Sequence, residues 1–425
     1  MTDQSLTTRQ KVERSIKRRR RAEMRFRTYG VLAISFGLLC LLTLFGNILA
    51  NGASAFKQTV IEVSLPLDGE YLGLNRNSSE EAFLKANYEG LIKKALKKQF
   101  KPKGRKQRRQ LYQLVSSGGH WQLQEYLMSH PEQLNQTVKI ALIADDDVDQ
   151  WFKHDRDKGV VGRLTDTQVQ WLEQWIDDGA LYTRFNTTFF TNGDSREPEL
   201  AGIRGAITGT FLTLLVTFLL SFPIGVAAAI YLEEFAPNNR MTELVEININ
   251  NLAAVPSITF GLLGLAIFIN VFGVARSTPL VGGLVLTLMT LPTIIISGRA
   301  AIKAVPPSIR EAALGLGASR VQVVFHHVLP LALPGMLTGT IIGMAQALGE
   351  TAPLLMIGMI AFVVDIPSFV TDPSTVLPVQ IFLWSDSPER AFTERTSGAI
   401  LVLLTFLISM NAVAVWLRRR LERRW

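Results

Sequence analysis

The sequence predicts an all-α polytopic membrane protein, with six transmembrane helices and a mixed α/β domain inserted outside the membrane between the first two. Hydrophobic residues make up 48% of the 425 residues, and the mean hydropathy of +0.22 is unusually high for a soluble chain. Apolar runs long enough to cross a hydrocarbon core of ~30 Å recur along the chain. They lie near residues 29–50, 203–231, 252–274, 279–298, 333–362 and 398–417. A hydrophilic block of about 150 residues separates the first run from the second.

Basic residues at both ends of the chain predict its topology. The segment 1–28 is rich in Lys and Arg immediately before the first apolar run, and the tail 418–425 is rich in Arg after the last. Because positive residues stay on the cytoplasmic side, we expect both termini in the cytoplasm and an even number of spans. The connection 232–250 is instead acidic, although acidic residues weigh little in this rule. Its carboxylates are Glu233, Glu234, Glu243 and Glu246.

The first apolar run, 29–50, has two interpretations. A basic leader, an apolar run and then Ala53-Ser54-Ala55 together resemble a signal peptide with an Ala-x-Ala cleavage site. The run is longer than the roughly 7–15 residues typical of a signal peptide, which favours an uncleaved transmembrane anchor. Cys40 lies inside this run and, as the single cysteine, forms no intramolecular disulfide.

The block 51–200 is long enough to fold as a domain, and with a cytoplasmic N-terminus it lies outside the membrane. Apolar residues that follow Val60, and the run 138–144, predict strands. Apolar residues at helical spacing within 84–100, and again around Trp171, predict helices. We therefore expect a mixed α/β domain.

Two charged segments of this domain each have a functional and a structural interpretation. Ten Lys or Arg residues between Lys93 and Arg109 either attract anions or lipid headgroups, or form a solvated helix face and loop. An acidic run offers oxygen ligands for calcium, but it lacks the glycine and the distal glutamate of an EF-hand loop, which favours a solvated turn. The run consists of Asp145, Asp146, Asp147 and Asp149.

The segment 201–417 contains the later apolar runs and is expected to form the membrane domain. The third run, 252–274, is the least regular because it begins with polar residues and Pro256. Glycines at 261–264 and 282–283 lie inside apolar runs, where close helix packing explains them better than phosphate binding.

The loop 299–332 is predicted to form a helix–turn–helix on the cytoplasmic side. Pro306-Pro307 block a helix upstream, Ser308 is a candidate cap, and Gly315 and Gly317 end the first helix. Taken alone, the pattern also fits an ordinary amphipathic connector. It resembles the coupling loop of ABC importer permeases, in which Glu-Ala-Ala is followed by Gly and later by Leu-Pro. The resemblance implies that a partner ATPase contacts Glu311, Ala312, Ala313, Gly315, Gly317 and Ala318.

Two histidines follow this first helix. His327 stands two residues before Leu-Pro, where the coupling pattern usually has isoleucine. No further His, Cys or carboxylate cluster nearby has the spacing of a metal site. We therefore expect His326 and His327 at the ATPase contact or at the membrane surface.

An ionisable side chain, Glu350, stands in the middle of the fifth apolar run, where a charge is costly and a function is the default expectation. Gly349 permits a close backbone approach, and Pro353 removes a helical hydrogen bond. We expect the helix to be kinked or broken here, which presents backbone N–H groups to an anion.

The run Gly349-Glu350-Thr351-Ala352-Pro353-Leu354-Leu355 resembles the signature of the PstA-type permease subunits of bacterial phosphate ABC transporters. The resemblance covers about residues 200–417 and implies a type I ABC importer permease fold. It also implies a translocation path that includes Glu350, Gln346, Thr351, Gly349 and Pro353.

The chain departs from this family four residues before the glutamate, where an arginine is usual and Gln346 stands. In a helix the two positions share a face. Arg299 either supplies the missing charge or, as we favour, extends its guanidinium to the membrane surface. Glu350 itself has two open roles. Its carboxylate accepts the proton that hydrogen phosphate carries and sulfate lacks, or it hydrogen-bonds a neighbouring helix or the partner permease.

The resemblance implies a permease subunit of an ATP-driven phosphate importer in the bacterial inner membrane. Its implied partners are a homologous permease subunit that completes a heterodimer, two cytoplasmic ATPase subunits and an extracytoplasmic phosphate-binding protein. The sequence contains no Walker A motif, so ATP hydrolysis is assigned to the partner and no cofactor is expected. Basic residues crowd at the membrane ends, which argues against a nucleic acid partner.

Two alternatives remain. One is an ABC permease for molybdate or sulfate, which the Gly-Glu-Thr-Ala-Pro run disfavours. The other is a membrane-anchored sensor or scaffold in which residues 51–200 are the working module.

Overall fold

The computed structural model describes residues 8–75, 78–156, 159, 162–359 and 362–421. The end of the expected basic tail, with Arg423 and Arg424, lies outside the described residues, as does the start of the expected basic segment 1–28. The chain divides into two compact units, Met1–Asn51 and Gly52–Trp425.

The first unit is formed by one long helix, α1 (Thr8–Ala55), whose last residues belong to the second unit. The helix continues without a break from the basic segment through the apolar run. Its portion Arg19–Ala55 is long and apolar enough to cross a membrane, and Cys40 lies on it as an exposed free thiol.

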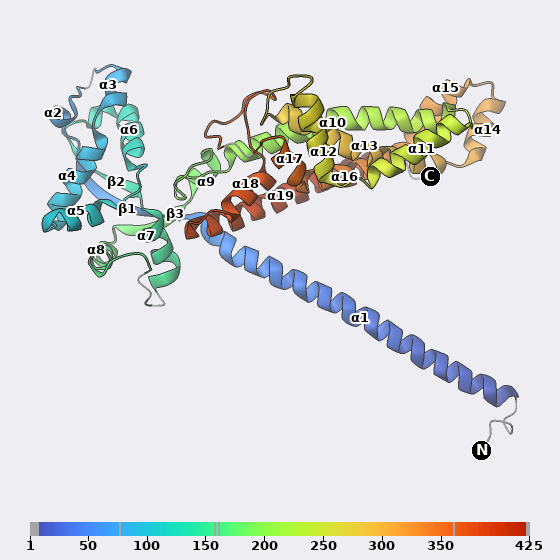
Figure 1. Cartoon of the computed structure of the whole chain (residues 1–425). Helices are drawn as coiled ribbons and strands as arrows, with labels where there is room; N and C mark the ends of the chain where they lie inside the picture. The colour runs from blue at the N-terminus through green and yellow to red at the C-terminus, as the bar shows by residue number, and fades with distance from the viewer. Residues whose placement is uncertain (1–7, 76–77, 157–158, 160–161, 360–361, 422–425) are drawn as a thin grey trace. The chain divides into compact units, whose positions relative to one another are not determined.

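The second unit begins with a three-stranded antiparallel sheet in the order β2-β1-β3 (Figure 1). β1 (Lys57–Pro66) is the central strand and pairs with β2 (Thr137–Ile143) on one side and with β3 (Leu181–Phe185) on the other. Most of its side chains are buried. The strands predicted after Val60 and over the run 138–144 are confirmed as β1 and β2. The third was not predicted, because Leu181–Phe185 is short and largely exposed.

Helices surround this sheet and complete a mixed α/β domain. They are α2 (Gly69–Leu72), α3 (Glu80–Lys85), α4 (Tyr88–Phe100), α5 (Gly104–Tyr112), α6 (Gly119–Ser129), the 3-10 turn η2 (Pro131–Gln133), α7 (Asp146–Gln150), the π-helix η3 (Trp151–Asp155), α8 (Asp166–Asp177) and α9 (Thr187–Thr191). The helices predicted within 84–100 and around Trp171 are confirmed, although the first of these segments is divided between α3 and α4 and Leu84 is 57% exposed. The core of the domain includes Leu91 and Trp175, both fully buried.

The remaining chain is almost entirely helical. Its elements are α10 (Arg204–Ile230), η5 (Tyr231–Phe235), α11 (Arg240–Ala253), α12 (Ser257–Gly264), η6 (Leu265–Ile269), α13 (Pro279–Lys303), α14 (Pro307–Gly315), α15 (Arg320–Gln322), η7 (Val323–Val328), α16 (Leu329–Gly349), α17 (Ala352–Met356), α18 (Leu377–Ser385) and α19 (Arg390–Leu421). Among the described residues, 5 helices are long and apolar enough to span a membrane, or up to 6 if a bent pair counts as one. A helical membrane protein is thus confirmed.

Two of the predicted spans differ from the observed helices. The third run, 252–274, is not one straight helix, because α11 and the α12–η6 segment meet at an angle of 102° around Pro256. The fifth run, 333–362, is not continuous, because the helix that begins at Arg320 ends at Gly349. Proline removes a backbone donor and restricts the residue before it, which explains the first break.

Glycine allows the membrane helices to pack closely, as expected. A Cβ on Gly283 of α13 would lie 2.5 Å from Val216 of α10, and a Cβ on Gly339 of α16 would lie 1.7 Å from the Ser297 hydroxyl of α13. α10, α13 and α16 therefore pack against one another through small residues. α19 joins this group through Phe406 and other apolar side chains.

Candidate functional site

The helix that carries the expected translocation residues ends at Gly349. Glu350 takes an extended conformation, with φ −78° and ψ 125°, and α17 begins at Ala352. The expected break is therefore present. Pro353 lies in the first turn of α17, where a missing N–H leaves no helical hydrogen bond unmade, so this proline starts a new helix and does not kink an existing one.

Glu350 lies directly after the end of α16, and its expected place at membrane depth stays a prediction. The shared face expected for Gln346 and Glu350 is lost, because four-residue spacing brings side chains together only inside a helix. The close approach expected at Gly349 is absent, since a Cβ there would meet no described atom within 4 Å.

The polar side chains around this break are accessible. Gln346 and Gly349 are exposed, and Glu350 and Thr351 are half-buried. Neither the Gln346 amide nor the Glu350 carboxylate makes a hydrogen bond or ion pair with another residue in the described ranges. Both groups are therefore available to a ligand or to a second subunit.

Packing against α12 fixes the backbone next to Glu350. Pro353 is buried so close to Gly261 that a Cβ on this glycine would lie 2.7 Å from the Pro353 Cα. Leu354 and Ile357 lie in an apolar cluster with Val281 of α13. The break is thus a rigid feature of the membrane domain and not a frayed helix end.

A second region of interest is the helix–turn–helix formed by α14 and α15. Pro307 is the first residue of α14, and Ser308 lies within the first turn without a capping bond, so the expected cap is wrong. The helix ends at Gly315, and the chain turns at Gly317, whose φ of +87° is a left-handed conformation that favours glycine.

The surface of α14 combines polar and apolar exposure. Leu316, directly after the helix, is 90% exposed, and Leu314 is 48% exposed. Ala313 is buried, in a cluster with Val323 and Val324 of η7. Large apolar side chains exposed within a polar rim are typical of a docking surface. The other candidates for the ATPase contact are exposed or, for Ala318, half-buried: Glu311, Ala312, Gly315, Gly317 and Ala318.

Ion pairs connect this segment to the end of α10. The Arg310 guanidinium donates to Glu234 Oε1 at 2.7 and 3.0 Å and to the carbonyls of Ile302 and Val305 at 2.9 and 2.6 Å. These bonds seat the start of α14 on the ends of α10 and α13.

Arg299 makes a second set of ion pairs on the same side. It donates to Glu246 at 2.7 Å and to Glu233 at 3.4 Å. These carboxylates engage the Arg299 guanidinium, a pairing that was not predicted, and the two roles expected for Arg299 stay predictions. The unusual acidity of 232–250 is the sequence signal for both sets of pairs.

The two charged segments of the α/β domain differ in their burial and in their partners. In the basic segment, Lys93 and Lys94 pair with Glu89 and Asp68. The other eight basic residues between Lys93 and Arg109 are exposed and make no ion pair with a described residue. They form a solvated face over α4 and α5.

The acidic run is not the solvated turn that we expected. Carboxylate oxygens of Asp145, Asp146 and Asp147 lie within 4.8 Å of one another in half-buried positions at the start of α7, which Asp145 caps. Burial and the neighbouring Asp146 charge raise the pKa of Asp145 to about 8. Burial likewise raises the pKa of Glu199, which accepts from the Ser116 hydroxyl at 2.6 Å, to about 7.

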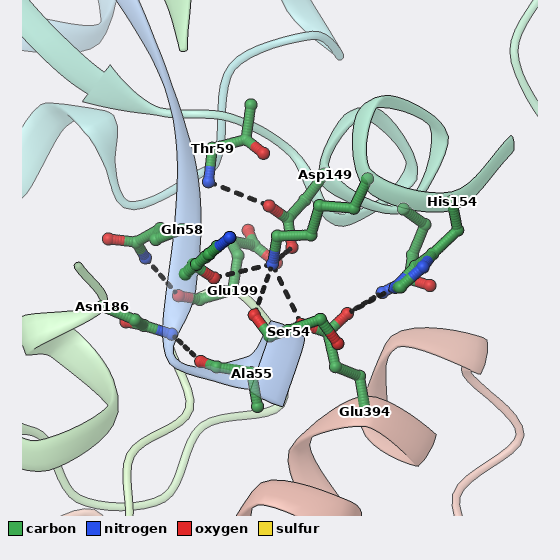
Figure 2. A network of polar contacts seen from close by, with 12 residues as sticks. Ser54, Ala55, Gln58, Thr59, Asp149, His154, Asn186, Glu199 and Glu394 are labelled. Atoms are coloured by element: carbon green, nitrogen blue, oxygen red, sulfur yellow. Dashed lines mark hydrogen bonds and ion pairs between the residues drawn. The ribbon is translucent and has the colours of Figure 1, made fainter. Parts of the chain in front are cut away.

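The fourth aspartate belongs to a buried ionic contact centred on Lys153 (Figure 2). The Lys153 ammonium donates to Asp149 Oδ2 at 2.7 Å, to Glu394 Oε1 at 2.9 Å and to the carbonyl oxygens of Lys57 and Ser54 at 2.6 and 3.2 Å. All three charged side chains are between 6% and 8% exposed. Sequence reasoning missed this contact, and its only signal was Glu394 and Arg395 at the edge of an apolar run.

Comparison with known proteins places both parts of the chain. Residues 221–425 match the family described as "Binding-protein-dependent transport system inner membrane component", and residues 13–161 match a "Domain of unknown function (DUF3333)". The probable ABC transporter permease protein YqgI of Bacillus subtilis is 30% identical over 54% of this chain and 82% of its own length. The phosphate transport system permease protein PstA 1 of Mycobacterium tuberculosis H37Rv is 30% identical over 54% of this chain and 73% of its own length.

Solved ABC transporters align with about half of this chain. The inward-facing MetNI methionine ABC transporter aligns with 51% of this chain and 95% of its own, at 18% identity and a TM-score of 0.43.

Proposed function

We propose that this chain is the permease subunit of an ATP-driven phosphate importer. It belongs to the binding-protein-dependent transport system inner membrane components and, among them, to the PstA-type permeases. In this proposal a homologous permease subunit completes the heterodimer, two cytoplasmic ATPase subunits supply the energy, and an extracytoplasmic phosphate-binding protein delivers the substrate. The protein then spans the inner membrane, with both termini on its cytoplasmic side.

The observation that carries the proposal is α14. A short helix with exposed Leu314 and Leu316 is held at its base by Arg310, so it is both accessible and firmly attached to α10 and α13. A partner groove that binds this helix differently in its ATP-bound and ATP-free states would transmit force to the membrane helices. In this assignment Glu311, Ala312, Ala313, Gly315, Gly317 and Ala318 form the ATPase contact.

The translocation path is assigned to the break after α16. Gln346, Gly349, Glu350, Thr351 and Pro353 lie at or beside it. The accessible and unpaired carboxylate of Glu350 supports this assignment, because it can accept the proton of hydrogen phosphate. Sulfate has no such proton and leaves the carboxylate facing a dianion, so the same group discriminates between the two.

Two observations favour phosphate as the substrate of this permease. Relatives at about 30% identity include proteins named phosphate transport system permease. The run from Gly349 to Leu355 also resembles the signature of those permeases.

Reconstitution of the complete transporter tests the proposal. We expect proteoliposomes that contain both permeases and the ATPase to accumulate radiolabelled phosphate only with ATP and the phosphate-binding protein present. Accumulation that needs neither would contradict an ATP-driven importer. Assembly with no ATPase at all would favour the sensor or scaffold alternative.

A further inference from the structure

The four acceptors of Lys153 come from separate parts of the chain (Figure 2). Asp149 belongs to α7 of the extracytoplasmic domain, and Glu394 lies in the first turns of α19. The carbonyls of Ser54 and Lys57 flank the point at which α1 ends and β1 begins. One ammonium group therefore holds the domain, the chain segment that enters it and the last membrane helix.

Further contacts surround this lysine and reinforce the same attachment. Gln150 donates to Glu394 Oε2 at 2.7 Å, and His154 lies 3.4 Å from the same oxygen. Arg395, which is 3% exposed, donates to the carbonyl of Ala55 at 3.4 Å. Asn186 donates to the same carbonyl at 2.9 Å.

Tight backbone packing continues the contact along α19. A Cβ on Gly398 would lie 2.6 Å from the Ala55 Cβ, and a Cβ on Gly52 would lie 2.8 Å from the Ser397 carbonyl oxygen. The end of α1 and the outer part of α19 are thus in direct contact around the ionic centre.

The hydrogen-bonding capacity of the Lys153 ammonium is fully used. An ammonium group has three protons, and the acceptors around Lys153 engage all of them. Asp149 accepts in addition from the Thr59 amide at 2.9 Å. An apolar contact tolerates sliding, whereas a buried charge that slides loses its partner, so this contact fixes one orientation.

Movement of α19 reaches the candidate translocation site. Phe406 and Met410 of α19 pack against the apolar cluster that contains Met344 and Leu348 of α16. Leu348 directly precedes Gly349, where α16 ends. Helix α19 therefore connects Glu394, the partner of Lys153, with the apolar cluster beside the break.

We propose that Lys153 locks the extracytoplasmic domain to α19, so that the domain and this helix move as one body, and that a partner binding the domain acts through them on the end of α16. Lys153 is in this view a positioning residue that acts through Glu394. The effect on transport rests on the proposed function, whereas the lock itself does not.

Distance measurement between two spin labels tests the lock. The labels are attached to cysteines introduced at two exposed positions, Ser129→Cys in the domain and Thr393→Cys on α19. The protein is full-length, carries Cys40→Ser and is studied in lipid nanodiscs. We expect a narrow distance distribution when Lys153 is present and a distribution about twice as wide or wider in Lys153→Met. Lys139→Met is the matched control, because its ammonium makes only an exposed pair with Glu62 at 3.1 Å, and it should leave the distribution narrow.

A second variant guards against simple misfolding. Glu394→Gln keeps an oxygen that accepts from Lys153 but removes the charge, and we expect a smaller broadening with unchanged emission from the buried Trp151 and Trp175. A distribution that stays narrow in both variants would overturn the lock.

Transport by the reconstituted complex tests the mechanical consequence. We expect Lys153→Met to lower phosphate uptake about tenfold or more, while ATP hydrolysis without binding protein changes about twofold at most. Wild-type uptake together with a broadened distance distribution would overturn the role in transport. Absence of uptake in the wild-type complex would instead contradict the proposed function and leave the distance result standing.

Discussion

Glu350 is the residue whose chemistry the account depends on most. Replacement by glutamine keeps the size and removes the charge and the strong acceptor. A hydrogen bond to a charged group contributes about 1.5–3 kcal/mol, so we predict that Glu350→Gln lowers phosphate uptake roughly tenfold to a hundredfold and reduces discrimination against sulfate. Competitive uptake of labelled phosphate measures both effects. Glu243→Gln, at an exposed position in α11, is the control. Unchanged rate and selectivity would end the idea of contact with phosphate.

Asp145 makes the stability of the α/β domain depend on pH. Its folded pKa of about 8 lies above its ordinary value of 3.8, so the folded state holds a proton that the unfolded state has lost. The contribution of Asp145 to the free energy of unfolding is therefore fully present below pH 3.8, and it is lost progressively as the pH rises toward about 8.

Asp145→Asn should remove this dependence, because asparagine caps a helix as well as aspartate does and carries no charge beside Asp146. We predict that the variant melts several degrees higher than the wild type at pH 8, at about 2–4 °C per kcal/mol, and that this difference becomes small near pH 4. Thermal melts of full-length protein at the two pH values measure this. A variant that is less stable at pH 8 would show that the Asp145 charge is favourable in the folded state.

Residue identity predicted some of these positions and not others. Glu350 was found because a carboxylate in an apolar run is rare. Lys153 and Arg310 were missed because each is an ordinary basic residue in a polar segment. Only folding brings them to Glu394 and Glu234, which are 241 and 76 residues away in the sequence.

Among the elements, the turn after α14 has the most specific backbone requirement. Gly317 has a φ of +87°, and a β-branched side chain is strongly disfavoured there. We predict that Gly317→Val displaces α14 and lowers the phosphate transported per ATP hydrolysed severalfold, because a strain of roughly 1–3 kcal/mol exceeds what this exposed turn absorbs. The ratio of uptake to hydrolysis in proteoliposomes is the measurement. Gly73→Val is the control, because Gly73 is a left-handed glycine with open space around it in the turn after α2, and this variant should stay coupled. Wild-type coupling in Gly317→Val would refute docking through α14.

The base of α14 is predicted to depend on one ion pair. Arg310→Met leaves Glu234, whose side chain is 13% exposed, without its cation and frees the carbonyls of Ile302 and Val305. We predict a loss of about 2–3 kcal/mol in stability, measured by thermal unfolding in detergent. Glu234→Met in the same chain should restore part of it. Lys303→Met is the control, since Lys303 is exposed and makes no ion pair with a described residue. Equal melting of Arg310→Met and wild type would show that packing alone seats α14.

Element prediction succeeded where the pattern is local. Apolar alternation located β1 and β2, and the prolines and glycines around α14 placed its ends within two residues. Prediction failed at 252–274 and at 333–362, where the apolar composition continues but the helix does not. Hydropathy reports whether a segment is buried in lipid or protein and is silent about the backbone dihedral angles of Pro256 and Glu350.

For the whole molecule, the structure connects parts that the sequence presented as separate. The domain 51–200 was expected as an insert of its own, and its side of the membrane remains a prediction. The described residues attach it to α19 by buried charges. At another part of the helices, Arg310 ties α14 to Glu234 of η5, and Arg299 of α13 pairs with Glu233 and Glu246. Such long-range ion pairs follow from the fold and not from local pattern, which is why sequence reasoning left them out.

The most direct test of the central claim is uptake of labelled phosphate at micromolar concentration by cells that lack this gene and by the same cells with the gene restored. Other phosphate uptake systems must be absent, and sulfate and molybdate are present as competitors. The account predicts that uptake is lost and then rescued, and that neither competitor lowers it. Uptake that survives loss of the gene, or that sulfate or molybdate suppresses, would contradict a phosphate permease.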